Sequence, residues 1–276
     1  MNEKRIKSVL LFLGSVLILL FALGPFGYMA LTGLTGNPEF FALGSECTLS
    51  LENFKTVLFS ESLHFPRYIV NSIVISAVSA SVTVGIASFA AYALTRLHLP
   101  AGRMIMFLIL GISMFPPVSL VSYLFQFMTT LGWMNTYQAL ILPYIAWTLP
   151  LSLWILVSYF QQVPVELDKA GLVDGCSRLK ILIRIILPVA APGVFSTLLL
   201  AFIFAFNEFL FALMLTTDYS ARTIPVGIAL FEGLHGRIPW GEIMAAATVT
   251  TIPVVLLALF FQRRIIQGLT RGAVKG

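Results

Sequence analysis

Long runs of apolar residues, separated by short polar segments, dominate the pattern along the chain. Six of these runs reach the length of about 20 residues that a helix needs to cross the hydrocarbon core of a bilayer. They lie at roughly 9–31, 68–94, 104–127, 138–160, 192–215 and 243–261. Their apolar positions are continuous and do not alternate with a period of two, which disfavours a membrane β-barrel. The pattern therefore predicts an all-α integral membrane protein with six transmembrane helices.

Polar and proline residues subdivide the middle of the chain. No Asp, Glu, Lys or Arg lies between Met104 and Val165, and the polar cluster TTLGWMNTYQ at 129–138 splits this stretch into a hairpin. Pro116 and Pro117 donate no backbone hydrogen bond, so the helix of the third run must kink or break there. Two interpretations remain open: a packing bend, which membrane helices accommodate, and a broken helix that lines a pathway.

Composition and charge support the membrane assignment and orient the chain. The 276 residues are 58% hydrophobic and 11% charged, whereas soluble domains have about 25% charged residues. Thirteen of the 17 Lys and Arg residues lie on the side that also holds both termini, and the positive-inside rule assigns this side to the cytoplasm. The net charge of +5 is therefore a topology signal and does not indicate nucleic-acid binding, because no basic patch on a soluble surface is visible.

The N-terminal segment starts like a secretory signal, with basic residues before an apolar run. That run is longer than usual and no clear A-x-A cleavage site follows it, so we expect a retained first span. We divide the chain into residues 1–67, the first helix and an outer loop with a short amphipathic helix at 49–58, and residues 68–276, a core of five helices. Cys47 and Cys176 fall on opposite sides and cannot pair. The Cys and His residues show no metal-ligand spacing.

The fifth apolar run contains Asn207 and Glu208 side by side. A carboxylate at membrane depth is costly unless it is paired, hydrated or close to an interface. One interpretation is that Glu208 snorkels or finds a partner within the bundle. The other is that both residues line a translocation pathway for a polar solute, with polar groups beside aromatic rings. Phe204 and Phe211, one turn away on either side, favour the second interpretation.

The segment QQVPVELDKAGLVDGCSRLKILIRIILPVAAPG, residues 161–193, is the longest loop on the cytoplasmic side. Pro164 and the acidic Glu166 are typical of a helix start, and the pattern predicts a short helix that ends at Gly175. A second amphipathic run follows at 179–188. Two short helices joined at a glycine form a knob at the membrane surface. The knob either only connects two spans, as many interfacial helices do, or contacts a partner.

The sequence of this loop is specific. The pattern E-L-x-x-A-x-x-x-D-G-x-S, followed by I-x-L-P, resembles the EAA loop of permease subunits of binding-protein-dependent ABC importers. The matching residues are Glu166, Leu167, Ala170, Asp174, Gly175, Ser177, Ile185, Leu187 and Pro188. The segment NSIVISAVSASVTVGIASFAAYALTR, residues 71–96, is similar to the start of that family's transmembrane core. The ending FQRRIIQGLTRGAVKG, residues 261–276, is similar to the tail of its carbohydrate branch, the MalG type.

The resemblance implies roles for individual residues. In that family the loop, here about 161–191, forms a coupling helix in a cleft of the ATPase. The implied coupling residues are Glu166, Leu167, Asp168, Lys169, Ala170, Gly171, Asp174, Gly175 and Ser177. The tail at 262–276 is implied to reach the ATPases through Gly268, Leu269, Gly272, Lys275 and Gly276; the alternative for the tail is an anchor without a fixed structure. The candidate pathway residues are Asn71, Phe204, Asn207, Glu208 and Phe211.

The chain departs from the family pattern at a few positions. Lys169, Ala170 and Gly171 stand where Glu-Ala-Ala is usual, so the acidic residue of the triplet is replaced. Cys176 stands where alanine is usual, and Phe206 replaces the Trp of the sugar branch's W-N-E/D motif. These departures concern individual contacts more than the role of the loop.

The resemblance implies a permease subunit of an ATP-driven importer that forms half of the pathway for a sugar, a di- or oligosaccharide such as maltose or trehalose. The implied partners are a second homologous permease, two copies of a cytoplasmic ATPase, and an extracytoplasmic sugar-binding protein, in a bacterial or archaeal cytoplasmic membrane. The chain has no G-x-x-x-x-G-K-[ST] loop, so ATP and Mg²⁺ are expected in the ATPases and the chain itself is expected to be non-enzymatic. The alternatives are a stand-alone secondary transporter, which commonly shows internal repeats and several intramembrane charges, and a membrane enzyme, for which no catalytic constellation appears.

Overall fold

The computed structural model describes residues 3–36, 49–97, 99–231 and 238–273, with side chains for 7–36, 49–97, 99–231 and 238–261. This part of the chain is helical and holds no β-strand beyond one isolated bridge between Thr35 and Leu49. The prediction of an all-α protein is therefore confirmed. The chain divides into two compact units, residues 1–66 with 227–253 and residues 67–226 with 254–276.

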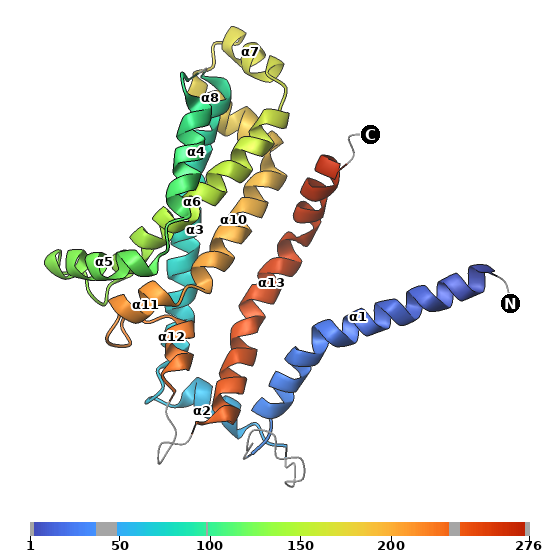
Figure 1. Cartoon of the computed structure of the whole chain (residues 1–276), viewed down its shortest axis with the longest axis vertical. Coiled ribbons are helices and arrows are strands. Elements are labelled where there is room, and N and C mark those ends of the chain that lie inside the picture. Colours follow the sequence, from blue (N-terminus) through green and yellow to red (C-terminus); the bar gives the residue numbers. More distant parts are fainter. Residues whose placement is uncertain (1–2, 37–48, 98, 232–237, 274–276) are drawn as a thin grey trace. The chain divides into compact units, whose positions relative to one another are not determined.

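Figure 1 labels most of the helices, which are numbered in chain order. Their bounds are α1 Glu3–Gly33, α2 Glu52–Phe59, α3 Phe65–Arg96, α4 Gly102–Ser113, α5 Val118–Thr130, α6 Tyr137–Gln162, α7 Glu166–Val173, α8 Arg178–Ile181, the π-helical η1 Leu182–Ile186, α9 Leu187–Val189, α10 Ala191–Phe206, α11 Leu210–Leu215, α12 Ile224–Ala229 and α13 Trp240–Ala273.

The described helices give up to six membrane spans. Four single helices are long and apolar enough to cross a bilayer, at Lys7–Gly33, Phe65–Arg96, Tyr137–Gln162 and Trp240–Phe261. Two bent pairs complete the set: α4 with α5, at 88°, and Arg178–Val189 with α10, at 85°. Five of these correspond to apolar runs of the sequence, and the pair that ends with α10 shares only α10 with the predicted run 192–215.

The third span is broken where the two prolines lie. Helix α4 ends at Ser113 and α5 begins at Val118, with Pro116 and Pro117 between them. Because neither proline donates a backbone hydrogen bond, the α4 ladder cannot continue through them. The angle of 88° is far larger than a packing bend, so the break itself is confirmed, and its place along a pathway stays a prediction.

The fifth span differs from its prediction. The run 192–215 was expected to form one helix, and this expectation is wrong: α10 ends at Phe206, and the six-residue α11 starts at Leu210. No proline or glycine lies at this break. The polar residues Asn207 and Glu208 lie between the two helices.

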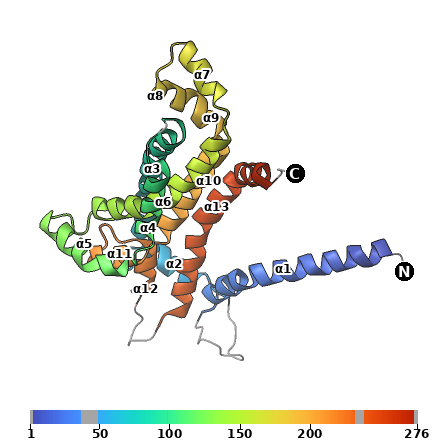
Figure 2. The same cartoon turned by 45° about the horizontal axis from the view of Figure 1, so that its top comes forward.

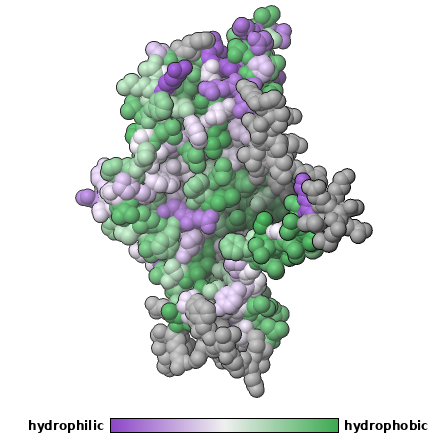
Figure 3. Space-filling view, turned by 45° about the vertical axis from the view of Figure 1, so that its right-hand side comes forward, coloured by the Kyte–Doolittle hydropathy of each residue, from purple (hydrophilic) through white to green (hydrophobic). Residues whose placement is uncertain are grey.

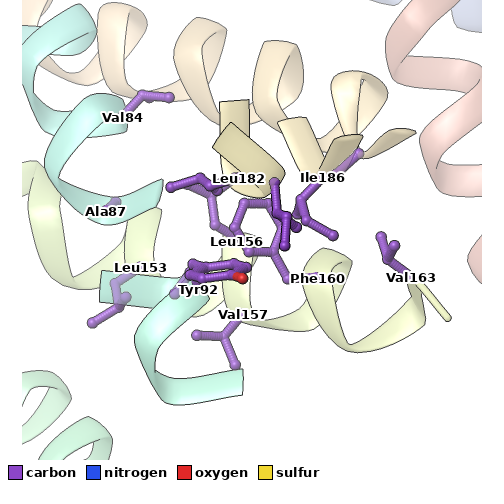
Figure 4. Close-up of a cluster of buried hydrophobic side chains, with 13 residues drawn as sticks. Val84, Ala87, Tyr92, Leu153, Leu156, Val157, Phe160, Val163, Leu182 and Ile186 are labelled. Atoms are coloured by element: carbon purple, nitrogen blue, oxygen red, sulfur yellow. The ribbon is translucent and has the colours of Figure 1, made fainter. Parts of the chain in front are cut away.

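The unit that contains residues 67–226 is built around a buried cluster of α3, α6, α8 and η1. Tyr92, Leu156, Phe160 and Leu182 lie at its centre (Figure 4). Helices α6 and α10 also approach closely, since a Cβ built on Gly193 would lie 2.2 Å from Cγ of Tyr159. Small residues at such positions let membrane helices pack backbone to backbone.

In the other unit, the Asn53 side chain joins α2 to the end of α1. Its Nδ2 atom donates hydrogen bonds to the carbonyl oxygens of Gly33 and Thr35, both at 2.9 Å. The short helix predicted at 49–58 is thus present as α2. Helix α1 exposes most of its large apolar side chains, with Phe21 85% exposed, as expected for a helix whose solvent is lipid.

Helix α7 lies at one end of its unit, beyond the ends of α6 and α10 (Figures 1 and 2). Figure 3 shows hydrophilic side chains gathered at this end, beside a few hydrophobic ones.

Candidate functional sites

Local sequence builds α7 and fixes the turn that follows it. Glu166 and Asp168 lie in the first turn, where acidic residues complement the positive helix end. At the other end, Cys176 N–H donates to the Gly171 carbonyl at 2.9 Å and Gly175 N–H donates to the Leu172 carbonyl at 3.1 Å. With Gly175 at φ +74°, these bonds form a Schellman motif. The helix therefore ends in a defined turn.

The turn leads directly into α8. The Ser177 hydroxyl accepts a hydrogen bond from the Lys180 N–H at 3.3 Å, which is the N-cap interaction that starts a helix. Behind the turn, a Cβ on Gly171 would lie 3.0 Å from Cγ1 of Ile181 and 3.1 Å from Cδ1 of Ile185. The small residue at position 171 lets α7 lie against α8 and η1, so the two short helices form a rigid knob.

The predicted coupling residues divide between two faces of this knob. Asp168 and Gly171 are buried and Leu167 is half-buried. The remaining predicted residues are exposed: Glu166, Lys169, Ala170, Asp174, Gly175 and Ser177. Beside them, Leu172 is 44% and Val173 87% exposed. The outer face thus mixes charged side chains with the two exposed apolar side chains of Leu172 and Val173.

The inner face holds an ion pair that sequence reasoning missed. The Asp168 Oδ2 atom lies 3.0 Å from the Arg96 Nε atom, and the two side chains are only 9% and 6% exposed. The Nη2 atom of Arg96 donates to the carbonyl oxygens of Val163, at 2.6 Å, and Phe160, at 3.1 Å. In the sequence, Arg96 counted only as one positive charge at the end of a span, because its partner becomes visible only in three dimensions.

The break after α10 explains the polar pair in the fifth run. Asn207 Nδ2 donates to the Ile203 carbonyl at 2.8 Å, which also accepts the Asn207 backbone N–H at 3.1 Å at the end of α10. The Glu208 carboxylate accepts from the N–H groups of Phe211, at 2.9 Å, and Ala212, at 3.2 Å. These N–H groups lack partners in the first turn of α11, and the positive helix end favours a carboxylate. Glu208 is therefore the cap of a broken membrane helix.

The candidate pathway residues near this break differ in their exposure. Asn207 is exposed, Glu208 half-buried and Phe204 50% exposed. Phe211, in contrast, is buried and contacts the Trp147 ring edge-on, with the centroids 6.5 Å apart. The buried Tyr144 hydroxyl interacts electrostatically with the Glu208 carboxylate. Asn207, Glu208 and Phe204 thus have accessible surface, while Phe211 packs in the core.

A small cavity lies beside these residues, between α4, α6 and α10. Its volume is about 150 Å³, and its lining includes four hydroxyl groups and two aromatic rings: Ser113, Thr148, Ser152, Thr197, Trp147 and Phe204. The Thr148 hydroxyl also lies 3.0 Å from the Thr83 hydroxyl. The hydroxyls were not among the predicted pathway residues, because isolated Ser and Thr residues in apolar runs are common in membrane helices.

Asn71 has a different environment from the other pathway candidates. Its side chain is completely buried. The Nδ2 atom donates to the Arg222 carbonyl at 2.9 Å and the Tyr219 carbonyl at 3.3 Å, and Oδ1 accepts from the Tyr137 hydroxyl at 2.6 Å. With its amide occupied in this way, Asn71 joins α3, α6 and the segment before α12 and presents no surface to a solute.

Asn135 is a second organising residue that was not predicted. It adopts φ +59°, and its Oδ1 atom accepts hydrogen bonds from the N–H groups of Thr217 and Asp218. Its carbonyl accepts from the Ser220 hydroxyl at 2.9 Å. The Ser220 backbone N–H in turn donates to Oδ1 of Asp218. Hydrogen bonds from Ser220 lower the pKa of the Asp218 carboxyl. One residue of the hairpin therefore shapes the loop that follows α11.

The C-terminal candidates are described only in part. Gly268, Leu269 and Gly272 lie in the last turns of α13, and Lys275 and Gly276 lie outside the described residues. Among the side chains that the structure describes, no group of three or more His, Cys, Asp or Glu could hold a metal ion.

The fold, the α7 knob and the break after α10 define a multi-pass helical membrane protein. Its rigid knob lies between the fourth and fifth spans. A sequence model of the family described as "Binding-protein-dependent transport system inner membrane component" matches residues 83–271. The chain is 54% identical, over 279 residues and 100% of both proteins, to the trehalose/maltose transport system permease protein MalG of Thermococcus litoralis. It is 40% identical to the trehalose transport system permease protein SugB of Mycobacterium tuberculosis, over 83% of each chain.

The fold agrees with a solved structure. A chain of a bacterial ABC transporter involved in the import of the acidic polysaccharide alginate superposes with a TM-score of 0.77 and 18% identity, over 96% of this chain and 98% of that one. This likeness concerns the fold alone. The chain belongs to the family of binding-protein-dependent transport system inner membrane components.

Proposed function

We propose that the chain is one of two permease subunits that form the pathway of an ATP-driven importer for a di- or oligosaccharide of the trehalose and maltose type. The observation that carries this proposal is the 54% identity to a trehalose/maltose permease along the full length of both chains. A trehalose permease at 40% identity supports the same substrate class. The stand-alone secondary transporter is not favoured, because the family consists of components of larger transport systems.

In this proposal, the outer face of α7 docks into an ATPase. The exposed Glu166, Lys169 and Val173 supply charged and apolar contacts, and the Schellman turn holds the face at a fixed angle. A rigid helix in a cleft passes on a rigid-body displacement when the ATPases close. ATP and Mg²⁺ bind in two ATPase copies, and this chain performs no chemistry. The positive-inside rule places α7, both termini and the tail toward the ATPases in the cytoplasm.

The pathway of this proposal passes the break after α10. Asn207 and the hydroxyl-lined cavity offer hydrogen bonds to sugar hydroxyls, and Phe204 offers an aromatic face to sugar C–H groups. A second, homologous permease completes the pathway. An extracytoplasmic binding protein delivers the sugar; the solved alginate importer, whose fold this chain shares, is reported in complex with a periplasmic protein that carries an alginate pentasaccharide. The membrane is the cytoplasmic membrane of a bacterium or archaeon.

The proposal is tested by purifying the tagged chain from its native membranes in mild detergent and identifying its partners by mass spectrometry. We expect a second permease and an ATPase in stoichiometric amounts. The same complex, reconstituted in vesicles with its binding protein, is expected to import radiolabelled trehalose or maltose only when ATP is present. Recovery of the chain alone, with solute uptake that needs no ATP, would instead support a secondary transporter.

A further inference from the structure

The buried ion pair behind α7 joins three elements at one point. Arg96 is the last residue of α3, and Asp168 lies in the first turn of α7. The planar guanidinium of Arg96 uses its Nε edge toward Asp168 and its Nη2 atom toward the carbonyls of Phe160 and Val163. These carbonyls lie at the C-terminal end of α6, where the helix dipole favours a cation. One side chain thus connects α3, α6 and α7.

The connectivity of the chain makes this contact important for α3. The knob is covalently continuous with α6 on one side and with α10 on the other, so a movement of α7 reaches both through the backbone. Helix α3 has no such link to α7. Its contacts with the knob include the Arg96–Asp168 pair, an electrostatic interaction of Tyr92 with the same Asp168, and the apolar cluster in which Leu167 is a partly buried member.

The electrostatics of the site favour a contact that holds its geometry. A buried charge that loses its partner is strongly unfavourable, so the two side chains stay together as their elements move. Arginine suits this position because its rigid fork can serve a carboxylate and carbonyl oxygens at the same time, whereas a lysine presents one point charge on a flexible stem. An apolar contact such as that of Leu167 can slide, but the ion pair cannot without leaving a buried charge unpaired.

We infer that Arg96 and Asp168 form a mechanical clamp that makes α3 move with α7, so that the pair is needed to couple ATP hydrolysis to solute transport. Arg96 is then a positioning residue: it touches neither the solute nor the ATPase, and it acts through the orientation of α7. This inference rests on the proposed function, because it assigns the clamp a role in the coupling of α7 to an ATPase.

The test uses the complete importer, reconstituted with its binding protein, and measures the number of sugar molecules transported per ATP hydrolysed. The variants are Arg96→Gln, Asp168→Asn, the double variant R96Q/D168N and the conservative Arg96→Lys. Arg103, an exposed arginine of α4, provides the matched control Arg103→Gln. Co-purification of the ATPase reports in each case whether the complex assembles.

We expect the single neutral variants to lower the transport ratio about tenfold, within the range typical of coupling between sites. Arg96→Lys is expected to retain part of the ratio and Arg103→Gln all of it. The double variant leaves no unpaired charge, so it assembles even where a single variant fails to fold. We expect it to bind the ATPase as the wild type does and still to transport with a low ratio.

A double variant that assembles and transports with the wild-type ratio would overturn the clamp, because the pair would then only neutralise buried charge. Single variants that assemble and keep the wild-type ratio would overturn it as well. These outcomes leave the proposed function intact. Failure of the unaltered complex to transport sugar with ATP would overturn the proposed function, and the inference with it.

Discussion

At the scale of single residues, Glu208 shows how a carboxylate is accommodated within an apolar run. Its two oxygens accept the N–H groups of Phe211 and Ala212, and charge-assisted bonds of this kind are stronger than neutral ones. The same carboxylate remains half-exposed beside Asn207. Glu208 can therefore cap α11 and also face the proposed pathway. Capping requires an acceptor oxygen, whereas a role in the pathway can also require the negative charge.

Substitution of Glu208 separates these two requirements. We expect Glu208→Ala to destabilise the protein by about 1–2 kcal/mol, the usual cost of a lost helix cap. Glu208→Gln keeps one acceptor oxygen and is expected to lose less than half of that stability. Thermal unfolding in detergent measures both. If Glu208→Gln is as stable as the wild type but transports poorly, the charge serves the pathway; if it is as unstable as Glu208→Ala, capping by the remaining oxygen is refuted.

Gly193 tests the close packing of α6 and α10. A methyl group there would lie 2.2 Å from the Tyr159 ring, so Gly193→Ala forces the helices apart and is expected to cost about 1–3 kcal/mol, as overpacking does. A methyl group added at Gly85, in the middle of α3, would meet nothing within 4 Å. Gly85→Ala is therefore the control, expected to gain about 0.5–1 kcal/mol from helix propensity.

The two variants are compared by thermal unfolding of the purified complex. The double variant G193A/Y159A removes the obstructing ring and is expected to recover part of the stability that Gly193→Ala loses. Equal melting temperatures for Gly193→Ala and Gly85→Ala would show that the helices do not approach as closely as the structure describes.

At the scale of elements, the knob depends on the left-handed turn at Gly175. A residue with a Cβ at φ +74° is strained by about 1–2 kcal/mol, so Gly175→Ala is expected to displace α7 and weaken capture of the ATPase. Gly132, at φ +68° in the hairpin after α5, provides a control with the same strain in another turn. Both variants lose similar stability, but only Gly175→Ala is expected to reduce the amount of ATPase that co-purifies. Equal loss of ATPase in both would contradict a role of the Gly175 turn in docking.

Asn135 allows a similar test for the loop after α11. Its side chain is the acceptor for two backbone N–H groups of that loop, and an unsatisfied group costs about 1–3 kcal/mol where it is buried and less where water reaches it. Asn135 also occupies φ +59°, which asparagine tolerates better than most residues. We expect Asn135→Ala to speed protease cleavage within 216–223 severalfold, and Asn135→Gly, which relieves the backbone strain, to do so less. Unchanged cleavage in both variants would show that the loop is ordered without Asn135.

At the scale of the whole molecule, the sequence predicts the features that depend on local pattern. Apolar runs give the six spans, Pro116 and Pro117 give the break in the third, and Gly175 gives the end of α7. The break in the fifth span was missed because 192–215 holds no proline or glycine near Asn207; the polar pair itself was the signal, and it was interpreted as a site alone.

The pairing of Arg96 with Asp168 lay beyond sequence reasoning for another reason. Both residues have ordinary explanations in the chain: one is a positive charge at the end of a span, and the other is an acidic residue in the first turn of a helix. Asn71 likewise suggested a pathway residue, but its partners in 219–222 come from a segment far along the chain. Long-range polar contacts of this kind have no local pattern, so they require the fold.

The orientation of the molecule in the membrane is the remaining prediction. Thirteen of 17 basic residues lie on the side of α7, and the positive-inside rule therefore puts α7 in the cytoplasm. In a variant whose native Cys47 and Cys176 are replaced by serine, Val173→Cys on α7 and Thr130→Cys at the end of α5 both place a thiol at an exposed position. We expect a membrane-impermeant maleimide to label Thr130→Cys in intact cells, and to label Val173→Cys only in inverted vesicles. The reverse pattern would invert the topology and separate α7 from any cytoplasmic ATPase, because a helix outside the cell cannot reach an ATPase within it.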